Sequence, residues 1–292
     1  MTFRKILCPT DFSAGSSCAL QTAAAIAVAH DAELVVANVW YVPAMVYAGE
    51  APVPSEVVEQ LTADCQRGLA AAVHDATALG VRRVSGRLLA GVPWDQLVAT
   101  LNRGDGFDLV VMGTHGRTGL ARILLGSVAE QVVRHAPCPV LTVRDPAGAA
   151  GVFRHVLCPI DFSDHSRPAI DLAASVITPG GAGITLLHVV ELPASYNEEP
   201  LRDDVIQELE QSAARRLERC ADELRARVAV PVTTRSRIGR PGAQILVTLD
   251  DDPSFDLVAM GSHGRTGLSR LLLGSVAEQV VRHAGCPVLV AR

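Results

Sequence analysis

Glycine and serine are spaced in one segment of the chain in a way that suits an anion-binding loop. Gly113, Gly116, Gly126 and Ser127 form a G-x2-G-x9-G-S pattern between an apolar run and a helical pattern. Glycines in such a loop permit positive φ and let a ligand approach the backbone closely. The unpaired N–H groups and the positive dipole end of the following helix suit a phosphate. The spacing therefore predicts a phosphate-binding loop.

The loop occurs twice, because the chain is an internal repeat. Gly261, Gly264, Gly274 and Ser275 repeat the pattern, and residues 107–144 match residues 255–292 almost letter for letter. The start of each half also matches, as KILCPTDFS and HVLCPIDFS. A duplicated domain is the simplest account. We expect one domain over residues 1–145, a linker rich in Gly, Pro and Ala over 146–151, and a second domain over 152–292.

Other residues of the loop carry alternatives. Ser127-Val-Ala-Glu130 fits a capping box, in which the serine satisfies the backbone of its own helix, and the same holds for Ser275. A hydroxyl in that role can still donate its proton to a phosphate oxygen. Arg117 and Arg265 suit neutralisation of a polyphosphate or a solvated loop, as do the recurring Arg122 and Arg270. His115 and His263 are solvated loop residues or bind a phosphate or a metal, and the identity of any metal stays open.

The second part of the site is expected at the end of the first strand of each half. Asp11 and Asp161 follow Cys-Pro-Thr and Cys-Pro-Ile. Each carboxylate either stabilises the first turn of the next helix or binds a ribose or a base. The backbone at Val39 and Val189, where the second strands end, is suitably placed to read an adenine edge. Ligands of open α/β sheets collect at these carboxyl ends, where the strand order reverses.

The pattern of elements predicts doubly wound α/β domains. In the first half, nearly continuous apolar runs typical of buried parallel strands alternate with helical patterns over 13–30, 55–79, 94–101 and 127–136. The second half repeats this order, and right-handed crossovers then build a parallel sheet. The segment 40–54, rich in Pro and Tyr, is either a surface loop or a lid over the site.

Composition excludes several classes of protein. The net charge is -5 without a long basic stripe, so we expect no nucleic-acid and no membrane partner. The start of the chain has no apolar signal core, which favours a cytoplasmic protein. The 7 cysteines form no CxxC pair, so we interpret Cys8, Cys158, Cys138 and Cys286 as small buried hydrophobic residues. No GxGxxG follows a strand, which argues against a dinucleotide cofactor.

The chain resembles a tandem universal stress protein of the ATP-binding class. The residues that carry the resemblance are CPTDFS and CPIDFS, NV and HV at the ends of the second strands, and MGTHGRTG and MGSHGRTG with the LLGSVAEQVVRHA segments. It implies two five-stranded parallel sheets of strand order 3-2-1-4-5, which are Rossmann-like and similar to adenine nucleotide alpha hydrolases. It assigns cofactor binding to Pro9, Thr10, Asp11, Val39, Met112, Gly113, Gly116, Arg117, Gly126, Ser127 and Val128, and to Pro159, Ile160, Asp161, Val189, Met260, Gly261, Gly264, Arg265, Gly274, Ser275 and Val276.

The resemblance also implies a function. We expect a regulatory protein of the stress response that binds ATP in one or both halves, with ADP or AMP as alternatives and Mg²⁺ as the companion of ATP, and that signals to a protein partner. The alternatives are a slow ATPase or phosphoryl-transfer enzyme, for which no metal carboxylate and no GxxxxGK[S/T] loop is evident, and an interaction protein with vestigial pockets. The apolar fifth strands predict an internal pseudo-dimer of the repeats, and a homodimer of whole chains is a further option.

Overall fold

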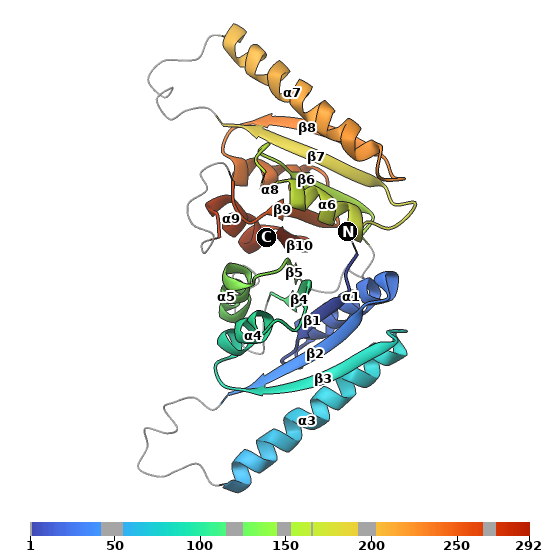
Figure 1. Cartoon of the computed structure of the whole chain (residues 1–292). Helices are drawn as coiled ribbons and strands as arrows, with labels where there is room; N and C mark the ends of the chain where they lie inside the picture. Colours follow the sequence, from blue (N-terminus) through green and yellow to red (C-terminus); the bar gives the residue numbers. More distant parts are fainter. Residues whose placement is uncertain are drawn as a thin grey trace, which may run out of the picture. The chain divides into compact units, whose positions relative to one another are not determined.

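The structure is a computed structural model that describes residues 2–41, 55–114, 125–144, 153–164, 166–191, 203–264 and 273–292. The chain divides into two compact units, Thr2–Gly151 and Val152–Arg292. In each unit strands and helices alternate along the chain (Figure 1). The segment 146–151 lies outside the described residues, as does 42–54, so the linker and the lid stay predictions.

The first unit contains five strands, and helices lie between them. The strands are β1 (Lys5–Pro9), β2 (Glu33–Trp40), β3 (Arg83–Ala90), β4 (Leu109–Gly113) and β5 (Val140–Val143). The helices that the structure describes there are α1 (Ala14–His30), α3 (Ser55–Ala78), α4 (Pro93–Asn102) and α5 (Ser127–His135). These bounds agree with the ranges predicted from the sequence to within one or two residues.

The second unit repeats this element order. Its strands are β6 (His155–Pro159), β7 (Gly183–Val190), β8 (Val232–Ile238), β9 (Leu257–Gly261) and β10 (Val288–Ala291). Its described helices are α6 (Arg167–Val176), α7 (Asp203–Arg225), α8 (Pro241–Asp251) and α9 (Ser275–His283). Helix α6 begins three residues later than the equivalent of α1, because Pro168 lacks an N–H group and fits only the first turn of a helix.

Each unit builds a parallel sheet of the predicted order. The first sheet runs β3-β2-β1-β4-β5 and the second β8-β7-β6-β9-β10, and neighbouring strands within each unit pair in parallel. The middle residues of the inner strands are buried, as their apolar sequences require; Ile6, Leu7 and Cys8 of β1 have no exposed surface. The predicted fold class is confirmed.

The strand order decides where the helices lie. From β6 to β7 to β8 the chain moves one way across the sheet, and it then crosses back to β9 and β10. Right-handed crossovers therefore place α6 and α7 on one face and α8 and α9 on the other. The contacts agree, because α7 packs on β7 and β8 while α8 packs on α9. The first unit follows the same scheme, with α1 against α3 and α4 against α5.

The reversal of direction opens a gap at the carboxyl ends of the central strands in each sheet. Strands β1 and β4 are neighbours, but the chain leaves their carboxyl ends toward opposite faces. The same holds for β6 and β9. Ligands of open α/β sheets bind in this crevice, so the fold predicts one candidate site per unit.

Candidate nucleotide-binding pockets at the strand ends

A cavity of about 260 Å³ lies at the carboxyl ends of the strands in the first unit. The ends of β1, β2 and β4, the start of α4 and the first turn of α5 build its wall. The predicted site residues that line it are Pro9, Thr10, Asp11, Val39, Met112, Gly113, Gly126, Ser127 and Val128. Segments more than a hundred residues apart in sequence thus meet in one place.

The corresponding cavity of the second unit is larger, at about 910 Å³. The predicted residues that line it are Pro159, Ile160, Asp161, Val189, Met260, Gly261, Gly264, Gly274, Ser275 and Val276. Gly116, Arg117 and Arg265 lie outside the described residues, as do His115, Arg122 and Arg270. The structure therefore brings together every predicted site residue that it describes.

The carboxylate of Asp11 is oriented by the turn that leads into α1. Its Oδ1 accepts hydrogen bonds from the Ser13 amide at 3.1 Å and from the Ser13 hydroxyl at 2.6 Å. Asp161 accepts the same pair from Ser163, at 3.0 and 2.6 Å. The carboxylate serves a local turn, as the first alternative from the sequence supposed, and it also borders the cavity.

The residue after each aspartate adopts an unusual backbone conformation. Phe12 has φ of 64° and Phe162 has φ of 62°, in the left-handed region that residues with a side chain rarely occupy. Such strain is often found at functional sites. The sequence carried no signal for it, since phenylalanine is not a residue that favours this region.

The glycine-rich loop is closed at its base by a backbone hydrogen bond. The Gly126 amide donates to the Thr114 carbonyl at 2.7 Å, and the Gly274 amide donates to the Ser262 carbonyl at 2.8 Å. The two ends of each loop are therefore held side by side, and the residue after the closing glycine starts the helix. This geometry fixes the direction in which α5 and α9 point their amino ends.

The capping-box interpretation of Ser127 and Ser275 is wrong. The N-cap residues are Gly126 and Gly274, and no side chain caps either helix. The serines occupy the first helical position, where they are exposed and line the cavities. Their hydroxyls and the amides of the first turn are therefore available to a ligand.

Glu130 and Glu278 do not fold back toward the helix start, as a capping box would require. Glu130 forms an ion pair with Arg134 at 3.2 Å, and Glu278 pairs with Arg282 at 2.8 Å. Each pair joins residues four apart on the helix surface. The acidic side chains thus point along the helix and away from its amino end, where a carboxylate would repel a bound anion.

The reason proposed for the loop glycines also needs correction. The described glycines Gly113, Gly126, Gly261, Gly264 and Gly274 are not among those with positive φ. Close packing explains three of them instead. A Cβ atom would lie 3.0 Å from the Gly15 carbonyl oxygen at Gly113, 3.0 Å from Oδ2 of Asp161 at Gly264, and 3.1 Å from the Ser262 carbonyl oxygen at Gly274.

Backbone groups at the end of the second strand face the cavity. The Ala37 carbonyl accepts from the Thr10 amide at 2.8 Å, whereas the Trp40 carbonyl accepts from Gly91 on the β3 side at 3.1 Å. Alternate residues of a parallel strand bond to the same neighbour. The N–H and C=O of Val39 consequently point toward the β1 side, beyond the last residue of β1. Val189 has the same arrangement beyond the end of β6, because Leu187 bonds to Ile160.

Sequence reasoning missed the side chains that hold the ends of β2 and β7 in place. Asn38 donates from Nδ2 to the Thr10 carbonyl at 2.8 Å, and His188 makes the equivalent bond from Nδ1 to the Ile160 carbonyl at 2.8 Å. Both side chains are buried. The sequence offered one signal for them: each is a polar residue in an apolar strand, directly before Val39 or Val189, and a buried polar residue requires a hydrogen-bond partner.

The buried cysteines are structural. Cys8 and Cys158 lie in β1 and β6, and burial raises the pKa of each thiol to about 12. Neither thiol therefore ionises near neutral pH. All 7 cysteines are free, and Cys138 is buried as expected, whereas Cys286 is partly exposed. In the described part of the chain, no group of three His, Cys, Asp or Glu side chains is placed to hold a metal ion.

Comparison with known proteins decides the family. The model of the Universal stress protein family matches residues 2–144 and again residues 153–292. The chain belongs to the universal stress protein family. The family and the two repeats expected from the sequence are thus confirmed, and the assignment to the ATP-binding class stays a prediction.

Individual relatives give the same result. Universal stress protein Rv2005c of Mycobacterium tuberculosis is 35% identical over 221 residues, which cover 72% of this chain and 69% of that protein. Universal stress protein MJ0531 of Methanocaldococcus jannaschii is 37% identical over 150 residues, covering 49% of this chain and 84% of that protein.

A solved structure supports the fold. The crystal structure of a universal stress protein from Archaeoglobus fulgidus superposes with a TM-score of 0.74 at 22% sequence identity, covering 99% of this chain and 98% of that one. Among the described residues of this universal stress protein, no helix is long and apolar enough to cross a membrane.

Proposed function

We propose that this universal stress protein binds ATP, or ADP or AMP in its place, in the strand-end pockets, and that it acts as a regulator through that binding. One observation carries the proposal: two sets of available backbone groups face one cavity. The first-turn amides of α5 lie at one side, and the peptide groups of Val39 lie at the other, with Asp11 at the end of the strand between them.

The chemistry of these groups matches the parts of a nucleotide. Amides at a helix start, with the exposed hydroxyl of Ser127 or Ser275, favour a phosphate group. An N–H and a C=O on one residue supply the donor and acceptor that an adenine edge requires. A carboxylate at Asp11 or Asp161 accepts hydrogen bonds from ribose hydroxyls. Each repeat presents all three, which supports a site in both.

Binding, rather than catalysis, is the function proposed. A regulatory cycle would follow from a change in conformation or assembly that a protein partner senses when nucleotide is bound. Mg²⁺ would accompany ATP on its phosphates, as it does in many nucleotide sites. A slow ATPase would show itself as release of phosphate by the purified protein, and the same assay separates the two functions.

The test uses substitutions that disturb a phosphate but suit the helix. Asp at the first helical position favours the helix dipole, so the double variant Ser127→Asp, Ser275→Asp should fold normally and place a negative charge in each cavity. We expect its affinity for ATP, measured by isothermal titration calorimetry, to fall at least roughly tenfold.

The matched control is the double variant Ser127→Asn, Ser275→Asn, which has nearly the same size and no charge. It should retain most of the affinity. The proposal is wrong if the unmodified protein binds no adenine nucleotide at millimolar concentration. It is also wrong if the Asp and Asn variants bind ATP equally well. Mass spectrometry of the nucleotide that co-purifies with the protein would identify the natural ligand.

A further inference from the structure

The two pockets differ at one position of the helix that follows the second strand. In the second unit, Arg216 of α7 lines the cavity, and its guanidinium carbon lies 4.1 Å from the centre of the Phe162 ring. The position that corresponds to it in the first unit is Gly68 of α3, because the segments ADCQRGL and QSAARRL align and each of the two residues directly precedes the leucine. At this position, one pocket thus has a cation and the other has none.

The aromatic ring after each aspartate contacts this helix position in both units, but its partner differs. A Cβ atom at Gly68 would lie 2.9 Å from Cζ of Phe12, so the Phe12 ring packs directly on the backbone of α3. In the second unit the Phe162 ring instead contacts Arg216 and lies 4.3 Å from the His188 ring, centre to centre. No residue of α3 lines the first cavity, whereas the second extends along α7 past Val205 and Leu209.

Arg216 keeps its hydrogen-bonding edge for a ligand. It is exposed, and among the described residues no carboxylate forms an ion pair or hydrogen bond with it. A guanidinium stacked on an aromatic ring still presents its N–H groups in the plane, where they match an oxyanion with two parallel hydrogen bonds. The ring holds the guanidinium in place, which lowers the entropy lost on binding.

The position of Arg216 indicates which part of a ligand it contacts. Helix α7 lies on one face of the sheet and α9 on the other, and the ends of β6, β7 and β9 lie between them. A nucleotide with its 5′-phosphates at the start of α9 would place its nucleoside toward α7. An anionic group that reaches Arg216 must therefore be carried by the nucleoside end of the ligand.

From this arrangement we propose that the second pocket prefers a nucleotide that carries an additional phosphate on its ribose, and that Arg216 determines this specificity. The inference rests on the proposed function, because it takes the start of α9 as the site of the 5′-phosphate. The first pocket, with Gly68 and a smaller cavity, binds the ordinary nucleotide and does not distinguish the two.

The experiment compares two probes that differ by one phosphate, AMP and adenosine 3′,5′-bisphosphate. Both are titrated into the full chain carrying Ser127→Asp, which leaves the second pocket as the measured site. We expect the bisphosphate to bind roughly tenfold more tightly than AMP, as a charged hydrogen-bonded pair at a partly exposed site would give. Arg216→Gln should reduce the ratio of the two affinities to about one.

The matched control is Arg219→Gln, which removes the same charge from an arginine of α7 that does not line the cavity. It should leave the ratio unchanged. If Arg216→Gln lowers both affinities equally, or neither, Arg216 does not read a ribose phosphate and the inference is wrong while nucleotide binding stands. If neither probe binds the second pocket and ATP does not bind either, the proposed function itself has failed.

Discussion

A methyl group at Gly264 would lie 3.0 Å from Oδ2 of Asp161, which is closer than the carboxylate can tolerate without moving. The other oxygen of Asp161 is held by Ser163 through two hydrogen bonds. Since the carboxylate is anchored on one side, a side chain at residue 264 must displace it or strain the loop. The close contact makes Gly264 a sensitive point of the second pocket.

We therefore predict that Gly264→Ala lowers the affinity of the second pocket for adenine nucleotide. Overpacking of this kind costs about 1 kcal/mol, which corresponds to roughly a fivefold loss of affinity. Calorimetric titration of the full chain measures it. Gly285→Ala is the control, because a Cβ atom at Gly285 would contact nothing within 4 Å. Equal affinities for the two variants would show that the packing of Gly264 on Asp161 has no part in binding.

At the scale of residues, the described site residues proposed from the sequence line one cavity in each unit, and their part in binding stays a prediction. Strand-end residues such as Asp11 and Val39 could be placed because ligands of this fold bind at carboxyl ends. Arg216 could not be found in this way, because the middle of each repeat matches only in pattern. Whether a residue of α7 borders the cavity depends on how far that helix extends past the sheet, which the sequence does not state.

At the scale of elements, the starts of α1 and α5 look alike in sequence but are built differently. Ser13 is the N-cap of α1, and its hydroxyl accepts from the Ser16 amide at 3.3 Å. Ser127 follows the N-cap of α5 and caps nothing. A serine three residues before an acidic residue fits a capping box in the sequence. In the structure the Glu130 amide donates to the Gly126 carbonyl at 2.9 Å, and this first bond of the helix places the cap one residue earlier.

The two serines should therefore respond differently to loss of the hydroxyl. We predict that Ser13→Ala lowers the free energy of unfolding by about 1 kcal/mol, because a capping hydrogen bond is lost. Ser127→Ala should change it by less than about 0.5 kcal/mol, as an exposed substitution does, while it weakens nucleotide binding. Urea denaturation of the full-length variants measures the first effect. A comparable destabilisation by both substitutions would mean that Ser127 does cap α5 in solution.

At the scale of the whole molecule, the repeats agree in topology. They differ in residues near the carboxyl ends of the strands and in residues at the amino ends. The alternation of elements predicted parallel sheets, the family resemblance implied the order 3-2-1-4-5, and the structure has this order in each unit. The pairing of the fifth strands between repeats stays a prediction. The effects of the differences between the repeats could not be read from the sequence. His155 stands where the first repeat has Lys5, and the effect of this exchange depends on the residues around it.

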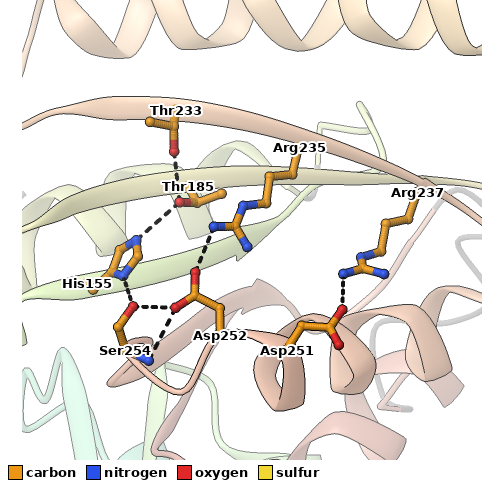
Figure 2. A network of polar contacts seen from close by, with 8 residues as sticks. All are labelled: His155, Thr185, Thr233, Arg235, Arg237, Asp251, Asp252 and Ser254. Carbon is orange, nitrogen blue, oxygen red and sulfur yellow. Dashed lines mark hydrogen bonds and ion pairs between the residues drawn. The ribbon is translucent and has the colours of Figure 1, made fainter.

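His155 lies at the start of β6, at the edge opposite the pocket, in a chain of hydrogen bonds (Figure 2). Its Nδ1 contacts the Ser254 hydroxyl at 2.8 Å, and its Nε2 contacts the Thr185 hydroxyl at 3.3 Å. Ser254 in turn donates to Asp252 at 2.5 Å, and Arg235 pairs with the same carboxylate at 2.7 Å. Because Ser254 donates its proton to the carboxylate, Nδ1 of His155 is the donor in the first contact.

Partial burial lowers the pKa of His155 in the folded protein. Asp252 and Asp256 act against this shift, and Arg235 acts with it. The His155 ring also packs on Phe255, with ring centres 4.1 Å apart. The unfolded chain therefore binds the proton more readily than the folded one. The contribution of His155 to stability is full above its unfolded pKa of about 6.5 and is lost as the pH falls through that value toward the lower folded pKa.

We predict that the second unit loses stability between about pH 7 and pH 5, and that His155→Gln removes most of this dependence. Glutamine does not titrate, and its amide can still donate to Ser254.

The measurement is urea denaturation at a series of pH values, followed by hydrogen exchange of β6 and β9 amides to separate the second unit from the first. The amides of β1 and β4 are the internal control, because Lys5 stands there in place of the histidine. The pKa of Asp252 is lowered by its hydrogen bonds with Ser254 and Arg235, so that carboxylate stays ionised down to pH 5 and does not contribute. An identical pH dependence in the parent protein and in His155→Gln would assign the effect to other groups.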